Sequence, residues 1–196
     1  MKFLLRLSGL LDALSERVGK SVMWLILAAI LVSAGNAVVR KAFHMSSNAL
    51  LEAQWYLFSA VFLLGAGYTF LKNAHVRIDF VSVRLSPRAR VWIDIVGIVA
   101  VLVPLCWILI ELSWPLFVNA WRSGETSQNY GGLIRWPIYL MLPLGMALLL
   151  LQGVSELIKR FAFLRGLIPD PLGRGPASRD SPAVAQADRV PPAKAR

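Results

Sequence analysis

Side chains that commonly carry catalysis or bind metals are scarce in this sequence. It contains two histidines, His44 and His75, and a single cysteine, Cys106, which excludes an internal disulfide framework and a multi-cysteine metal site. The HExxH, GxSxG and phosphate-loop motifs are absent. We therefore expect a protein that is not an enzyme and that binds no cofactor and no metal.

Seven residues at the edges of apolar segments are the candidates for a partner contact or a structural polar role. Ala29, Ser33 and Ala37 recur every four residues, so they share a helix face that a second helix can approach closely. The amide of Asn36, beside this face, could hydrogen-bond within the chain's own bundle or to another protein. The full set of candidates is Asn36, Arg40, Glu52, Trp55, His75, Arg77 and Asp79.

The apolar composition determines which elements must position these residues. Of the 196 residues, 57% are apolar and 16% are charged, and the mean hydropathy is +0.59. A soluble domain has about 25% charged residues, and a helix of about 20 apolar residues spans a bilayer core of about 30 Å. We predict an all-α integral membrane protein with four transmembrane helices, at about 21–39, 51–71, 91–112 and 136–157.

No ionisable side chain is predicted near the middle of a span. Asp94 and Glu111 fall near the two ends of the third segment, and Glu156 falls at the end of the fourth. Both histidines fall in connections, which argues against a haem held between the helices. Pro104 and Pro143 lie inside spans, where we expect kinks.

The distribution of basic residues predicts the orientation in the membrane. The chain has 21 Lys and Arg against 11 Asp and Glu, a formal charge of +10 that in a soluble protein would suggest a nucleic-acid partner. Counted by segment, 17 basic residues fall on one side of the four spans and 4 on the other. Because cytoplasmic loops retain Lys and Arg, both termini should be cytoplasmic, and no nucleic acid is expected.

Two of the candidate positions have more than one interpretation. Glu52 opens the second span, where the helix N-terminus favours a carboxylate, and it could also form an ion pair with Arg40. After His75, apolar residues alternate with Arg77 and Asp79, so this connection could lie along the inner membrane interface. It is either an ordinary basic loop or a contact with a partner.

The two ends of the chain differ from the transmembrane domain at 21–165. Residues 1–20 have one apolar helical face, which predicts an amphipathic interfacial helix; a cleaved signal peptide is the alternative, but Arg6 interrupts its apolar core. Residues 166–196 hold six of the eleven prolines. We predict a disordered cytoplasmic tail, either functionally neutral or touching anionic lipid.

A series of short motifs runs through the chain from about residue 15 to 165. They are Asn36 with Arg40, Glu52 with Trp55, Gly65-Ala66-Gly67-Tyr68, His75-Val76-Arg77-Ile78-Asp79, Trp136-Pro137 and Pro143-Leu144-Gly145. In this order they resemble the small permease subunit of tripartite ATP-independent periplasmic (TRAP) transporters, the DctQ-like family. The motif around His75 is the most specific, and the Pro-rich tail lies outside the family pattern.

The resemblance implies a membrane subunit that works beside a much larger permease. In that family the large permease carries the substrate and ion sites, and a periplasmic solute-binding protein delivers the solute. An ion gradient, usually sodium, drives uptake without ATP hydrolysis. This chain would then be a non-catalytic scaffold in the bacterial inner membrane, with those two proteins and membrane lipids as its partners, in uptake of an organic acid or related small solute.

Two other functions are compatible with the residues. The chain could be a self-sufficient small transporter that works as a homo-oligomer, which would require a charge inside a span. It could also be a membrane-anchor or assembly protein unrelated to transport. Co-purification with a large permease separates these functions from that of a TRAP subunit.

Overall fold

The computed structural model describes residues 2–44, 47–72 and 86–168, and these are almost entirely helical. No strand occurs in these ranges; a single antiparallel bridge joins Thr126 to Ile134. The elements are α1 (Lys2–Phe43), α2 (Asn48–Leu71), α4 (Pro87–Gly97), the π-helical turn η1 (Ile98–Leu102), α5 (Val103–Ser123) and α6 (Trp136–Leu164).

Four helical stretches are long and apolar enough to cross a membrane. They are α1, α2, α6 and the continuous run through α4, η1 and α5. The predicted all-α architecture with four transmembrane helices is confirmed. The third and fourth helices continue beyond the predicted ends at 112 and 157, to Ser123 and Leu164.

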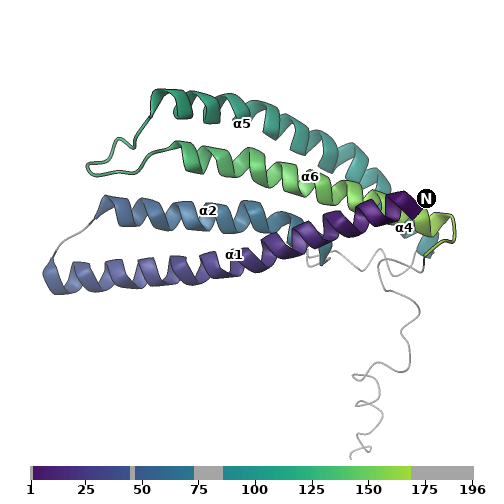
Figure 1. The fold of residues 1–196 in the computed structure, drawn as a ribbon, viewed down its shortest axis with the longest axis horizontal. Coiled ribbons are helices and arrows are strands. Elements are labelled where there is room, and N and C mark those ends of the chain that lie inside the picture. The colour runs from purple at the N-terminus through teal and green to yellow at the C-terminus, as the bar shows by residue number, and fades with distance from the viewer. Residues whose placement is uncertain (1, 45–46, 73–85, 169–196) are drawn as a thin grey trace, which may run out of the picture.

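The helices form two antiparallel pairs that lie side by side (Figure 1). In the first pair α1 packs along α2, in the second α5 packs along α6, and α2 and α6 join the pairs. We call the end where α1 is followed by α2, and where residues 124–135 join α5 to α6, the hairpin end. The opposite end, with the start of α1, α4 and the end of α6, is the terminal end.

Small residues allow these helices to approach closely. A Cβ added at Gly145 in α6 would lie 2.6 Å from the backbone oxygen of Leu63 in α2. A Cβ added at Gly19 in α1 would lie 2.2 Å from the ring of Tyr68 in α2. Close approach at small residues is a principal source of helix association in membranes, where water exclusion contributes little. Gly145, one of the family-like motif residues, therefore has a packing role.

The interfacial helix predicted at 1–20 is continuous with the first span. α1 runs unbroken from Lys2 to Phe43, and its first half lies against α6. The polar side chains Ser8 and Ser15 are buried in that contact, whereas the apolar Phe3 and Leu10 are 75% and 69% exposed. The amphipathic pattern is present, with its polar face toward the bundle and its apolar face outward.

The predicted irregularity at Pro104 takes the form of a π-helical turn. Pro104 has no N–H to donate and crowds the carbonyl one turn earlier, and η1 directly precedes α5, of which Pro104 is the second residue. α6 continues through Pro143, which is buried. Of the predicted tail at 166–196, all but the first three residues lie outside the described residues.

Candidate functional site

Glu52 is the centre of a polar cluster at the hairpin end. This buried carboxylate, in the second turn of α2, accepts hydrogen bonds from residues of the connection between α5 and α6. The Ser127 hydroxyl and the Asn129 amide donate to Oε1, the latter at 2.8 Å. The backbone N–H of Leu133 donates to Oε2 at 2.7 Å. Glu52 therefore attaches α2 to the connection that follows α5.

The connection itself is folded around this carboxylate. The bridge between Thr126 and Ile134 closes it, and Gly124 and Gly131 take positive φ values of 62° and 70°, which glycine adopts without strain. Arg135 forms an ion pair with Glu125 at 3.0 Å. Hydrogen bonds to Tyr139 and Glu125 raise the pKa of Arg135 above its usual range.

Two side chains of α2 add hydrogen bonds to the same connection. The Tyr56 hydroxyl donates to the carbonyl of Ile134 at 3.3 Å, and the Asn48 amide donates to the carbonyl of Tyr130 at 3.1 Å. The Tyr130 side chain itself is almost fully exposed. The first three turns of α2 thus hold the connection against the bundle and leave an aromatic side chain at its surface.

The hypothesis of an ion pair between Glu52 and Arg40 is wrong. Among the described residues no ion pair joins them, and the Glu52 carboxylate is occupied by the 124–135 connection. Arg40 is exposed in the last turn of α1. Arg40 was the expected ion-pair partner because it is a basic residue close to Glu52 in the sequence. The observed partners lie within residues 127–133, more than seventy positions later, and this stretch contains no basic side chain.

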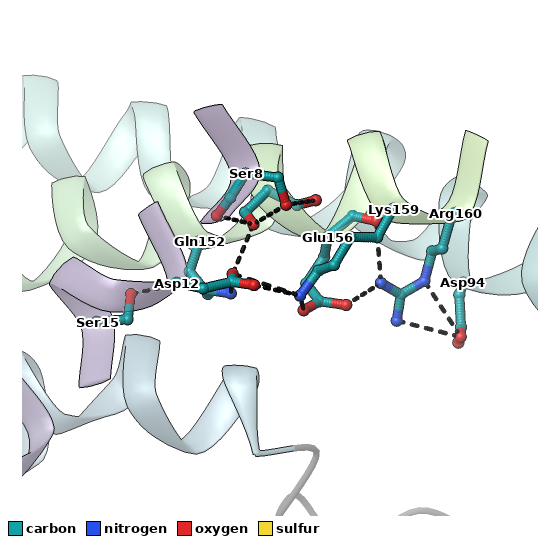
Figure 2. A network of polar contacts seen from close by, with 9 residues as sticks. Ser8, Asp12, Ser15, Asp94, Gln152, Glu156, Lys159 and Arg160 are labelled. Atoms are coloured by element: carbon teal, nitrogen blue, oxygen red, sulfur yellow. Dashed lines mark hydrogen bonds and ion pairs between the residues drawn. The ribbon is translucent and has the colours of Figure 1, made fainter. Parts of the chain in front are cut away.

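A larger polar network lies at the terminal end, which we call the terminal-end network (Figure 2). It joins α1, α4 and α6, and comprises Ser8, Asp12, Ser15, Asp94, Gln152, Ser155, Glu156, Lys159 and Arg160.

The part of this network between α1 and α6 centres on Asp12. Its carboxylate accepts hydrogen bonds from the Ser155 hydroxyl at 2.6 Å and from the Gln152 amide at 2.9 Å. Lys159 Nζ lies 3.1 Å from Asp12 Oδ2. The hydroxyls of Ser8 and Ser155 lie 2.8 Å apart. The first helix is thus fixed to the last by contacts between residues that are more than 130 positions apart in the sequence.

The remaining part consists of ion pairs around Arg160. The guanidinium, fully buried, donates to the carboxylate of Glu156 one turn earlier in α6 and reaches Asp94 Oδ2 in α4 at 3.3 Å. Lys159 also pairs with Glu156. Three carboxylates, those of Asp12, Asp94 and Glu156, thus face two basic groups. Buried charges are tolerated only when they are paired in this way.

Sequence reasoning missed this network, although the pattern is visible in the sequence. Ser8, Asp12 and Ser15 are spaced by four and three residues, so they share one face of α1. The polar residues of α6 recur over two turns in the same manner, from Gln152 to Arg160. The prediction for residues 1–20 used only their apolar face. The polar face of the same residues is the one that packs against the polar face of the last helix.

The other candidate residues are not gathered into one site. Asn36 is buried in the second half of α1, and its side-chain oxygen has no hydrogen-bond partner among the described residues. Trp55 is largely exposed and lines a surface hollow of about 290 Å³ beside Glu52. His75, Arg77 and Asp79 lie outside the described residues.

The helix that contains Glu111 extends well beyond the end predicted for the third span at 112. Because α5 continues to Ser123, Glu111 is twelve residues before the end of the helix and not at its edge. Its side chain is exposed on the outside of the bundle. The described residues contain no group of three or more His, Cys, Asp or Glu that could hold a metal ion.

Comparison with known families identifies the chain. Residues 29–163 match the family model described as tripartite ATP-independent periplasmic transporters, DctQ component. Searches of curated proteins and of solved structures give no significant match. The match covers more than half of the chain and all four membrane-spanning helices at least in part. The chain therefore belongs to the DctQ family of TRAP transporter components.

Proposed function

We propose that this protein is the small, non-catalytic membrane subunit of a TRAP transporter and acts as a scaffold for the large permease. The family membership is the observation that carries the proposal. The large permease would contain the solute and ion sites. A periplasmic binding protein would deliver the solute, an organic acid or a related small molecule, and an ion gradient, usually of sodium in this family, would drive uptake.

The arrangement of polar side chains in the structure supports a scaffold. The hairpin-end cluster and the terminal-end network lie at opposite ends of the bundle, and their members bind one another. In transporters that bind their substrate within the membrane, ligand sites are usually near the midplane between helices. Within the described part of the bundle, the contacts we find instead join helix to helix.

The orientation we propose places the terminal end in the cytoplasm and the hairpin end in the periplasm. The segregation of 17 basic residues to one side and 4 to the other supports it. In this orientation Glu52 and the 124–135 connection face the compartment from which solute arrives. The membrane is the bacterial inner membrane, and lipids cover the apolar surface that partner proteins leave free.

Co-purification tests the proposal. The full chain, tagged and expressed together with the genes that neighbour its own, should retain a multi-span permease of much greater mass through detergent extraction and size-exclusion chromatography. Recovery of this chain alone, as a monomer or homo-oligomer, would contradict it. Membranes with the permease but without this chain should show reduced solute uptake, whereas a membrane anchor unrelated to transport would leave uptake unchanged.

A further inference from the structure

The helix α5 has two distinct faces, each with a seven-residue repeat. Cys106, Ser113 and Ala120 are small, buried and spaced by seven. Each is followed directly by a tryptophan, and these are Trp107, Trp114 and Trp121. All three tryptophans are more than half exposed. The small residues lie in the contact with α6, and the tryptophans form a stripe on the outside of the bundle.

Glu111 lies on this aromatic stripe. It follows Trp107 by four residues and precedes Trp114 by three, so the three side chains share one face of the helix. No hydrogen bond or ion pair engages Glu111 in the ranges that the structure describes. By contrast, the carboxylates of Glu52, Asp12 and Glu156 all have partners within the chain.

The depth of Glu111 makes an unpartnered carboxylate costly. At the hairpin end, Trp121 packs edge-on against Trp136 at the start of α6, with ring centroids 4.6 Å apart; at the terminal end, Asp94 pairs with Arg160. At about 1.5 Å per residue, Glu111 lies about 15 Å from the first level and about 25 Å from the second. In a bilayer core of about 30 Å centred between them, it lies about 5 Å from the midplane.

The tryptophans on either side of Glu111 also indicate a protein contact and not a lipid surface. Tryptophans that face lipid gather at the headgroup level. This stripe instead descends from Trp121 to Trp107, about 21 Å deeper into the membrane. A seven-residue repeat keeps one helix face in register with a second helix along its whole length, as in a left-handed helix pair. Lipid requires no such register.

We propose that the stripe of Trp107, Glu111 and Trp114 is the surface on which a transmembrane helix of the large permease docks, with a basic side chain of that helix paired to Glu111. Charged groups at this depth are found paired with one another or facing protein. A symmetric contact with a second copy of this chain is disfavoured, because it would bring two Glu111 carboxylates together. The inference rests on the proposed function and names the helix face and the chemistry of the contact.

Co-purification of Glu111 variants tests the charge pairing. Glu111→Gln keeps the size of the side chain and removes its charge, so it should weaken retention of the permease about 3- to 30-fold in apparent Kd. Glu111→Lys should weaken it further. Glu16→Gln, which neutralises a partly exposed carboxylate of α1 that pairs with Lys20 at the terminal end, is the control and should leave retention of the permease unchanged. Wild-type retention by both Glu111 variants, with helical content unchanged, would overturn the pairing.

Photo-crosslinking tests the surface independently. Benzoylphenylalanine placed at Trp107 or Trp114 should form adducts with the permease, whereas the same residue at Leu31, exposed on α1, should not. Adducts from Leu31 but not from the stripe would overturn the docking surface and leave the proposed function intact. Adducts between two copies of this chain would overturn it in favour of a homo-oligomer. Failure of the wild-type chain to retain any permease would refute the proposed function itself.

Discussion

Removal of the Arg160 side chain should strongly destabilise the bundle, because it takes the guanidinium away from two carboxylates that lie at a helix contact. Arg160→Met keeps much of the apolar volume but removes the charge that pairs with Glu156 and Asp94. Breaking a buried ion pair from one side costs about 3–5 kcal/mol. Glu156 would retain Lys159, and Asp94 is one-fifth exposed to solvent. We therefore expect about 3 kcal/mol, the lower end of that range.

The free energy of unfolding in mixed detergent micelles, followed by circular dichroism, measures this effect. Arg165→Met, at the exposed end of the same helix, is the control and should change the free energy of unfolding by no more than about 0.5 kcal/mol. The double variant Arg160→Met with Glu156→Leu should recover about half of the loss, because it also removes the buried carboxylate that has lost its guanidinium partner. A loss below about 1 kcal/mol for Arg160→Met, or no recovery in the double variant, would refute the reasoning.

Two further predictions concern the hairpin end and the helix contacts. Glu52→Ala should raise the rate of amide hydrogen exchange at Leu133 about tenfold or more, because the connection loses three hydrogen bonds. The control Glu125→Ala should have little effect on this rate. Equal exchange rates in both variants would contradict the role of Glu52. Gly145→Ala should lower the free energy of unfolding by about 1–3 kcal/mol, because the new Cβ meets the Leu63 backbone. The control Gly35→Ala should not lower it, because no atom lies within 4 Å of a Cβ at that position. An unchanged free energy of unfolding in Gly145→Ala would place the close helix contact elsewhere.

The four-helix architecture could be predicted from the sequence because the bilayer sets a fixed length for each apolar segment. The helix ends were less predictable. α5 continues past Glu111 to Ser123, and in this extension Trp121 packs against Trp136 of α6, outside the most apolar part of the segment. The sequence spacing of residues predicts which side chains share a face of one helix. Hydropathy alone does not reveal how far a helix continues beyond its apolar segment.

The candidate site was predicted only in part. Glu52 was among the candidate residues, but its hydrogen-bond partners Ser127, Asn129 and Leu133 follow it by more than seventy residues and are themselves uncharged. Asp12 and Lys159 were hidden for the same reason, since they meet only when α1 and α6 pack together. Which polar side chains of distant segments meet depends on which helices are neighbours in the bundle. The residue pattern within one segment does not determine its neighbours.

Solute uptake into proteoliposomes tests the central claim most directly. Vesicles would contain this chain alone, the co-purified large permease alone, or both, with the binding protein and solute outside and an imposed ion gradient. We predict gradient-driven uptake at full rate only when both chains are present, and none with this chain alone. Uptake by this chain in the absence of the permease would contradict the scaffold role.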